Sequence, residues 1–316
     1  MIKEERDGIR IFAGNANPAL AAKICDKLGV PISGSTVKHF ADGEIDVQIL
    51  DSIRGKDCYV VQSTCRPVND NIMELLVMID ALRRASAGHI TAVIPYYGYA
   101  RADRKASPRV AITAKLIANL ITTAGANRVI TIDLHAAQIQ GFFDIPVDHL
   151  YARPVILDYL RRRDLGNTVI VSPDVGNVKG ALSFAKKLNI MDLVIIDKRR
   201  PCPNKAEIYN IIGDVKGKTC FILDDIVDTA GTLCQAAKAI KERGAKHIIA
   251  AASHAVLSDP ALQRIEESPI EEMIFTDSIP LDASKSAKIK VLSVAELIAE
   301  AIKRNHEGLS ISELFE

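Results

Sequence analysis

The stretch CFILDDIVDTAGT (220–232) places three aspartates at the end of an apolar run. Asp224 and Asp225 follow the run directly, and Asp228 begins the sequence DTAGT. Carboxylates this close together repel one another, so they need a cation or a hydrogen-bonding ligand nearby. The residue types at this point therefore indicate a ligand site.

The segment DTAGT (228–232) has the composition of a phosphate-binding loop. It opens a predicted helix, whose N-terminus adds positive potential. The small residues Ala230 and Gly231 let backbone N–H groups converge on an anion, and the hydroxyl groups of Thr229 and Thr232 can add donors. The loop differs from the Walker type, which needs the pattern G-x-x-x-x-G-K-[ST].

Beside this loop, Asp224 and Asp225 are suited to accept hydrogen bonds from vicinal sugar hydroxyl groups. A phosphate site and a diol site together predict a phosphorylated sugar as the ligand. The alternative interpretation is an Asp228 that caps the helix while its acidic neighbours are exposed to water.

Three further predicted strands end in polar groups, IDLH (132–135), SPD (172–174) and IDKRR (196–200). In open α/β sheets, ligands bind beyond the carboxyl ends of the strands. Asp133 and His135 lie two residues apart and share a face if their strand extends that far. A neutral imidazole there can serve a metal-bound phosphate, and the alternative is a core histidine satisfied by an aspartate.

Lys198, Arg199 and Arg200 place three cations just before Pro201. Proline precludes a continuing helix, so this segment is predicted to be a loop. Mobile cations can neutralise the negative charge of phosphate oxygens when a site closes. The alternative is a solvated charged face.

Apolar runs alternate with helical patterns along the chain, which predicts two doubly wound α/β domains with parallel sheets. Seven helices and eight strands are expected. The strands are 9–14, 57–62, 89–97, 128–134, 168–174, 192–198, 219–225 and 247–257; the helices are 18–29, 71–87, 112–125, 152–163, 177–189, 230–243 and 294–305.

The segment 147–160 lies between the two halves, so we place the domain boundary there. An N-terminal α/β domain then spans residues 1–150 and a C-terminal α/β domain spans 151–316. The final helix can pack back onto the N-terminal domain, as terminal segments often do.

The composition restricts the function further. A formal net charge of +1 and the absence of tryptophan argue against a general nucleic-acid binder. No apolar run approaches the length of a membrane span, and the N-terminus has no apolar signal core. The six cysteines form no C-x-x-C pair and are interpreted as reduced core thiols of a cytoplasmic protein.

The acidic pair followed by DTAGT resembles the loop of type I phosphoribosyltransferases that binds phosphoribosyl diphosphate (PRPP). Nearly the whole chain is similar to one related family, the ribose-phosphate diphosphokinases, or PRPP synthetases. The resemblance is carried by FADGE (40–44), RGKDCYVVQST (54–64), PYYGYARADRK (95–105), TIDLHAAQIQGFFDIPVDHL (131–150), SPDVGNVKG (172–180), IDKRRPCPN (196–204) and IIGDVKGK (211–218).

The resemblance implies the type I phosphoribosyltransferase fold in both domains and the conversion of ribose 5-phosphate and MgATP to PRPP and AMP. It implies that Lys198 is the principal catalytic cation and that Arg200 supports it and approaches ribose 5-phosphate. It also implies that Asp174 and His135 coordinate magnesium, with His135 on the ATP side. The ribose 5-phosphate site would comprise Arg200, Asp224, Asp225, Asp228, Thr229, Ala230, Gly231 and Thr232.

For ATP, the resemblance implies contacts from Phe40, Asp42, Gly43 and Glu44, often supplied by a neighbouring subunit. Arg101, Ala102 and Arg104 match nucleotide-phosphate positions, although Ala102 stands where glutamine is common. Asn177 and Cys202 are further departures beside site loops. On their own, residues 40–44 are predicted to form a tight turn, and the arginines could be ordinary surface residues.

The family class implied is activated by inorganic phosphate and inhibited by ADP at a site between subunits. Arg54, Ser310, Ser312 and Phe315 match that region, and the alternative for the tail is a frayed C-terminus. We therefore expect a homo-oligomer, from a dimer to a hexamer. Two other functions stay open, a phosphoribosyltransferase that consumes PRPP and a non-catalytic regulatory subunit.

Overall fold

A computed structural model describes residues 8–315 except 174–175, 177 and 200–207. Asp174, Asn177, Arg200 and Cys202 therefore lie outside the described residues. The chain divides into two compact units. Unit 1 comprises Met1–Ala152, Ser278–Pro280 and Ser293–Glu316; unit 2 comprises Arg153–Asp277 and Leu281–Leu292.

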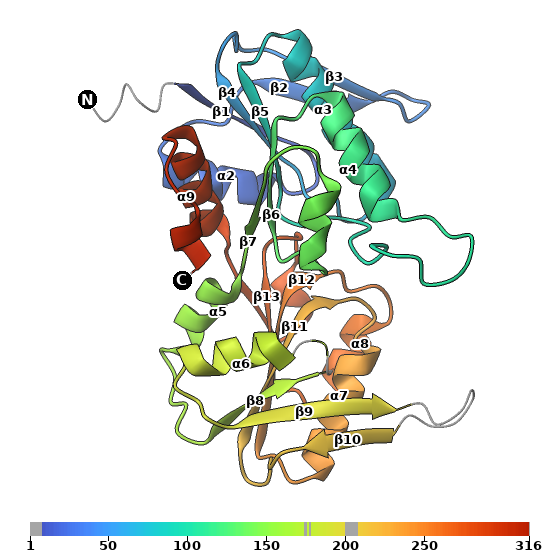
Figure 1. The fold of residues 1–316 in the computed structure, drawn as a ribbon, viewed down its shortest axis with the longest axis vertical. Helices are drawn as coiled ribbons and strands as arrows, with labels where there is room; N and C mark the ends of the chain where they lie inside the picture. Colours follow the sequence, from blue (N-terminus) through green and yellow to red (C-terminus); the bar gives the residue numbers. More distant parts are fainter. Residues whose placement is uncertain (1–7, 174–175, 177, 200–207, 316) are drawn as a thin grey trace. The chain divides into compact units, whose positions relative to one another are not determined.

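Unit 1 is built on a parallel five-stranded sheet of order β1-β4-β5-β6-β7 (Figure 1). Its inner strands β4, β5 and β6 are buried beyond their first residue because helices cover both faces of the sheet. The sheet strands are β1 (Ile9–Ala13), β4 (Asp57–Val61), β5 (His89–Ile94), β6 (Arg128–Ile132) and β7 (Val147–Leu150); the helices are α2 (Pro18–Leu28), α3 (Val68–Arg84), α4 (Thr113–Ala124), α9 (Ala295–His306), and the 3₁₀ segments η2 (Ala137–Phe142) and η4 (Ser312–Phe315).

The last long helix, α9, belongs to unit 1 although it follows unit 2 in the sequence. It packs against α2, and Lys27 Nζ lies 2.9 Å from Glu296 Oε2. The buried hydroxyl group of Tyr59 donates to Asn305 Oδ1 at 3.0 Å. These contacts link the end of the chain to the first sheet.

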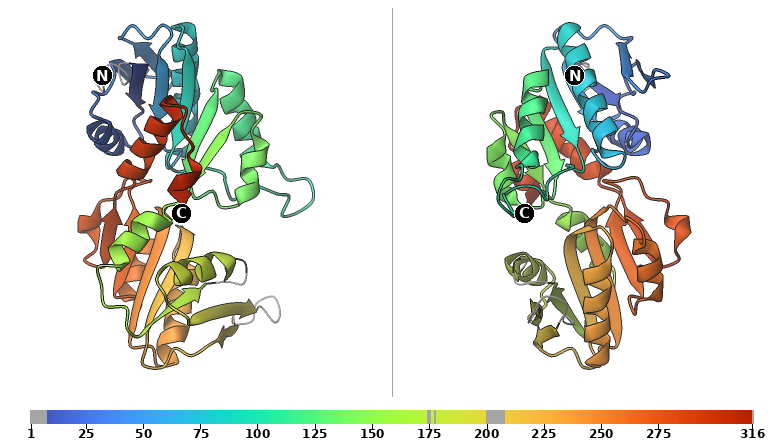
Figure 2. Two further views of the ribbon diagram at one scale, coloured as in Figure 1. Left: turned by 60° about the vertical axis from the view of Figure 1, so that its left-hand side comes forward. Right: turned by 90° about the vertical axis from the view of Figure 1, so that its right-hand side faces the viewer.

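Unit 2 has a seven-stranded sheet of order β10-β9-β8-β11-β12-β13-β14, with α7 and α8 on one face and α5 and α6 on the other (Figure 2). Among the described strand pairs of this sheet, β9 and β10 are antiparallel and the others are parallel. The strands are β8 (Thr168–Ser172), β9 (Leu193–Arg199), β10 (Ile208–Ile212), β11 (Thr219–Val227), β12 (His247–Ala255), β13 (Glu272–Thr276) and β14 (Ile289–Leu292); the helices are α5 (Arg153–Leu160), α6 (Val178–Lys187), α7 (Gly231–Glu242), α8 (Ala261–Glu267) and the 3₁₀ segment η3 (Ala283–Lys285).

Both sheets confirm the predicted α/β class with helices on both sheet faces. The sequence patterns missed an antiparallel hairpin of β2 (Ser35–His39) and β3 (Ile45–Ile49) in unit 1. They also missed four strands of the two main sheets, β7, β10, β13 and β14, because most of these strands are short or lie toward a sheet edge. The expected linker 147–160 begins as strand β7 of unit 1.

No helix in the described ranges has the length and hydrophobicity needed to cross a bilayer. Five of the six cysteines lie in the described part, and all five are unpaired and buried: Cys25, Cys58, Cys65, Cys220 and Cys234. This agrees with their interpretation as core thiols.

Candidate functional site

The predicted phosphate-binding loop, residues 228–232, lies at the junction of β11 and α7 in unit 2. Ala230, with a φ of +56°, is the N-cap of α7 and makes no side-chain cap hydrogen bond. The first intrahelical bond shown at this end runs from Cys234 N to Ala230 O at 3.0 Å. The N–H groups of the first turn have no intrahelical acceptor and can receive an anion. Asp228 is not the N-cap, so the interpretation of this aspartate as a helix cap is wrong.

An arginine that the sequence did not single out supports this loop from α8. Arg264 Nη1 donates to the Thr229 carbonyl oxygen at 2.9 Å. A Cβ atom added at Gly231 would lie 3.3 Å from the same nitrogen, so the guanidinium group lies close against the loop backbone. The signal was missed because α8 is short and was not predicted.

The acidic pair lies within β11, which continues to Val227 rather than ending at residue 225 as predicted. Asp224 pairs in register with Ala252 of β12, and Asp225 N donates to Asp224 Oδ1 at 2.9 Å. Both residues are half-buried. Consecutive strand residues alternate between faces, so the two carboxylates start from opposite faces of the sheet. They are therefore expected to have different roles.

The strand order places β8 directly between β9 and β11. The strands β8, β9 and β11 run parallel, so their carboxyl ends lie at one edge of the sheet. Lys198 and Arg199 are part of β9, where Lys198 pairs with Tyr209 of β10. Lys198 ends the predicted strand 192–198, and Arg199, which was expected in a loop, also belongs to β9 because the strand pairs with β10 through this residue.

In unit 1, His135 lies in the loop that follows β6. The strand ends at Ile132, so Asp133 and His135 do not share a strand face as the sequence suggested. Asp133 has a φ of +39°, its N–H donates to Leu150 O at 2.9 Å, and its Oδ2 accepts from Ala152 N at 3.0 Å. His135 itself is exposed. The aspartate is thus a backbone anchor, and the histidine is left accessible to a ligand.

The loop that carries Arg101, Ala102 and Arg104 follows the neighbouring strand β5, and both arginines are exposed. Gln138 Nε2 donates to Asp103 Oδ2 at 3.2 Å, which joins this loop to the His135 loop. The structure therefore brings the predicted nucleotide-phosphate residues to the same edge of the unit 1 sheet as His135.

Residues 40–44 form the predicted turn, which is the tip of the β2–β3 hairpin. Phe40 N donates to Glu44 O at 2.8 Å, and Gly43 has a φ of +95° that favours glycine. Phe40 is 57% exposed. Figures 1 and 2 show the hairpin tip and the loop after β5 projecting from different places on unit 1. Within this unit, the structure does not bring Phe40 next to the Arg101 loop.

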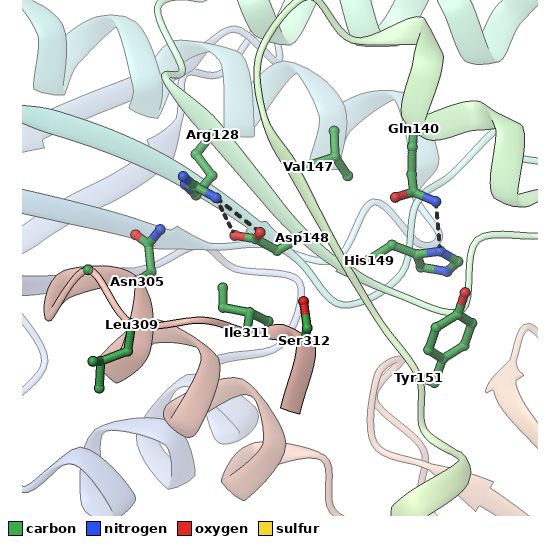
Figure 3. A pocket seen from close by; sticks show the side chains of 11 residues that line it. Arg128, Gln140, Val147, Asp148, His149, Tyr151, Asn305, Leu309, Ile311 and Ser312 are labelled. Carbon is green, nitrogen blue, oxygen red and sulfur yellow. Dashed lines mark hydrogen bonds and ion pairs between the residues drawn. The ribbon is translucent and has the colours of Figure 1, made fainter. Parts of the chain in front are cut away.

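A cavity of about 490 Å³ lies in unit 1 between β7 and the C-terminal tail (Figure 3). Arg128 Nη1 contacts both carboxylate oxygens of Asp148 at 3.0 and 2.8 Å. Burial raises the pKa of Asp148, although the hydrogen bond and charge of Arg128 oppose the shift. The cavity is lined by Arg128, Gln140, Val147, Asp148, His149, Tyr151, Asn305, Gly308, Leu309, Ile311 and Ser312.

Of the predicted regulatory residues, Ser312 lines this cavity. Ser310 lies beside it in the tail, where its carbonyl oxygen accepts from Arg304 Nη1 at 2.8 Å. Arg54 is exposed in the turn before β4 and does not line the cavity. Phe315 ends η4. The tail segment around Ser310 is hydrogen-bonded to α9 rather than frayed.

Parallel sheets covered by helices, with polar loops beyond the carboxyl ends of their strands, define the class of open α/β proteins, which bind ligands at that edge. A model of the N-terminal domain of ribose phosphate pyrophosphokinase matches residues 9–125, and a model of the phosphoribosyl synthetase-associated domain matches residues 198–316. The chain belongs to the ribose-phosphate pyrophosphokinase family, as its similarity to full-length relatives shows.

The chain is 58% identical over 311 residues to the ribose-phosphate pyrophosphokinase of Caldanaerobacter subterraneus subsp. tengcongensis, with 98% of each chain covered. It is 56% identical over 312 residues to that of Burkholderia pseudomallei, again with 98% of each covered. The crystal structure of phosphoribosylpyrophosphate synthetase from Mycobacterium smegmatis superposes with a TM-score of 0.90 at 44% identity, covering 95% of this chain and 99% of the other. These findings confirm the predicted family.

Proposed function

We propose that the chain transfers the β,γ-diphosphoryl group of MgATP to the anomeric hydroxyl group of ribose 5-phosphate. A bond forms between the anomeric oxygen and the β-phosphorus, and the bond from that phosphorus to the oxygen bridging it to the α-phosphorus breaks. AMP leaves with the bridging oxygen, the hydroxyl proton is released, and the other product is PRPP. The observation that carries this proposal is the similarity of nearly the whole chain to ribose-phosphate pyrophosphokinases. The uncapped N-terminus of α7, which can bind a phosphate group, supports it.

The phosphate of ribose 5-phosphate binds the first turn of α7, where Ala230 leaves backbone N–H groups without a side-chain cap. Thr229 and Thr232 are exposed and add hydroxyl donors. Asp228 completes the loop, and Asp224 and Asp225 accept hydrogen bonds from sugar hydroxyl groups. Because the two strand carboxylates start from opposite faces of the sheet, they accept from different hydroxyl groups of the sugar.

Lys198 and Arg200 carry the charge stabilisation of the transferring group. Lys198 lies near the carboxyl end of β9, which neighbours β8, the strand before Asp174; β11, which contains Asp224, lies on the other side of β8. A cation placed where charge develops lowers the barrier most when water is excluded. Arg200 follows directly and contacts ribose 5-phosphate.

The nucleotide site comprises His135, Arg101, Ala102 and Arg104 of unit 1. The two loops that hold these residues are linked by the Gln138–Asp103 hydrogen bond, so they form one surface for the phosphates of ATP. Ala102 has no polar side chain, so ATP phosphate contacts at this point come from its two arginine neighbours and from the backbone.

Mg²⁺ fits this donor set. Among the described residues, no group of three or more His, Cys, Asp or Glu side chains is arranged to hold a metal ion. Mg²⁺ in nucleotide sites keeps several waters and is held by phosphates with one or two protein ligands, for which His135 and Asp174 are the candidates. When bound, the ion neutralises the charge that develops on the phosphate oxygens.

The hairpin tip completes the adenine pocket of a neighbouring copy. Phe40 is exposed on a projecting tip, with Asp42, Gly43 and Glu44 beside it. The tip lies apart from the loop that carries the two arginines in its own unit. A complete ATP site therefore needs a homo-oligomer, from a dimer to a hexamer. Inorganic phosphate as activator and ADP as inhibitor act near Ser310, Ser312, Phe315 and Arg54, with Arg54 supplied by another subunit. The chain functions in the cytoplasm.

An assay with ATP, ribose 5-phosphate and Mg²⁺ tests the reaction. Phosphorus NMR should show AMP and PRPP forming in equal amounts, and omission of ribose 5-phosphate should stop AMP formation. Consumption of PRPP in the presence of a nucleobase, with no AMP formed from ATP, would instead indicate a phosphoribosyltransferase. No turnover in either assay would favour a regulatory subunit.

Subunit mixing tests the shared site. An inactive Lys198→Ala variant is combined with an inactive Asp42→Ala/Glu44→Ala variant, and native mass spectrometry verifies exchange. Mixed oligomers should regain part of the activity because one site receives intact residues from both chains. Absence of recovery in verified mixed oligomers, or full specific activity from a monomer in sedimentation, would refute the shared site.

A further inference from the structure

One buried imidazole contacts both ends of the loop that carries His135. His149 lies on β7 and is 5% exposed. Its Nε2 atom accepts from the backbone N–H of Leu134 at 2.8 Å, and its Nδ1 atom lies 3.3 Å from the side-chain amide of Gln140 (Figure 3). The ring centroid is 4.6 Å from that of Tyr151. The two contacted residues lie before and after the exposed histidine in the sequence.

The Leu134 contact defines the state of the ring. A backbone N–H can only donate, so the Nε2 atom of His149 must be unprotonated to accept this hydrogen bond. The proton of the neutral imidazole then lies on Nδ1, so the Gln140 Nε2 amino group, which is itself a donor, is a neighbour of this atom and does not donate to it. A side chain without an acceptor at this place would leave the Leu134 N–H unsatisfied in a buried environment, which is costly.

This contact is one of three hydrogen bonds that hold the loop to β7 and to the residues just after it. Asp133 donates its N–H to Leu150 O at 2.9 Å and accepts from Ala152 N at 3.0 Å. With the contact from His149, two successive loop residues, Asp133 and Leu134, are held by the edge strand and the residues just after it. Asp133 is in the left-handed region, which is unfavourable for a residue with a Cβ atom, so these bonds keep an otherwise disfavoured backbone in place.

We propose that His149 is a positioning residue for the reaction: it fixes the Leu134 amide and thereby aims the exposed His135 at the nucleotide. The inference rests on the proposed function, since that function assigns His135 to MgATP. His149 does not touch the substrate. It acts through the backbone N–H group of Leu134, which precedes His135 in the sequence.

Two variants of similar size test this role. His149→Gln can present an amide oxygen near the position of Nε2, whereas His149→Leu removes the acceptor. His149→Leu should lose about tenfold in kcat/KM for MgATP, because the orientation of His135 is relaxed, while KM for ribose 5-phosphate stays within about twofold. His149→Gln should restore most of the loss. Hydrogen–deuterium exchange without ligands should show faster exchange of the Leu134 amide in the leucine variant only.

A matched control is His306→Leu, which removes another histidine contact of unit 1, the bond from His306 Nδ1 to Asp57 Oδ2 at 2.5 Å. This variant can lower stability but should leave the Leu134 amide and kcat/KM for MgATP unchanged. Unchanged kinetics in His149→Leu, or an equal loss in the control, would refute the positioning role. If His149→Leu does not fold, His149→Gln provides the test. Wild-type exchange of its Leu134 amide together with a tenfold loss in kcat/KM for MgATP would also refute the positioning role. Inactive wild-type protein would refute the proposed function, and the exchange data would still report on the contact itself.

Discussion

Removing the guanidinium group of Arg264 should weaken the binding of ribose 5-phosphate. Arg264 Nη1 holds the Thr229 carbonyl oxygen at 2.9 Å. The C=O and N–H groups of a planar trans peptide point in opposite directions, so this bond also aims the Ala230 N–H away from the guanidinium group. We infer that it orients the loop before the phosphate arrives.

The size of the effect follows from the exposure of this side chain. A hydrogen bond from a charged donor contributes roughly 1.5–3 kcal/mol, but water can replace part of it at an exposed residue, which leaves about 1 kcal/mol. About 1 kcal/mol corresponds to a roughly fivefold rise in KM for ribose 5-phosphate. Arg264→Met is the suitable variant because it keeps the apolar stem and removes the donors.

Steady-state kinetics with each substrate varied in turn provides the assay. A matched control is Lys241→Met, which removes a cation at the other end of α7, where Lys241 Nζ donates to Lys246 O at 2.8 Å. A long-range charge effect would appear in both variants and disappear at high salt, whereas the loss of the loop contact should persist. An equal rise in KM for ATP, or equal effects of the two variants, would show that the reasoning is wrong.

Three further predictions concern the site and the core. Lys198→Ala should lower kcat by about 10²–10³-fold with the fold intact by circular dichroism, because a cation that stabilises the transition state is lost; near wild-type kcat would exclude it from the mechanism. Asp224→Asn should raise KM for ribose 5-phosphate about tenfold and change KM for ATP less, and the opposite pattern would assign this carboxylate to the nucleotide. Burial raises the pKa of Cys58 and Cys220 to about 12 and that of Cys25 and Cys65 to about 11. The folded state keeps these thiols protonated above their ordinary pKa of 9.0, so the free energy of unfolding should be highest below pH 9 and should fall as the pH rises toward 11. Urea denaturation at pH 8 and pH 10.5 measures this, and a higher stability at pH 10.5 would contradict it.

Local sequence patterns were sufficient to predict the elements that carry most of the proposed site. The run at β11 and the small-residue turn before α7 are recognisable because composition and periodicity within one segment specify them. The hairpin turn at residues 40–44 was predicted for the same reason. Strand ends were less accurate, since β11 continues beyond Asp225 and β6 stops before Asp133.

Long-range contacts decided what the sequence could not show. The sheet order places β8 between β9, which contains Lys198, and the acidic strand β11, and this order depends on which strands pair across the sheet. The contact from His149 to Leu134 joins residues 15 positions apart through a strand that was expected to be a linker. Arg264 reaches Thr229 from a helix that has no strong pattern of its own. The type of a residue and its neighbours in the sequence are local information. Its hydrogen-bond partner depends on how the strands and helices pack together, and only the folded chain determines that packing.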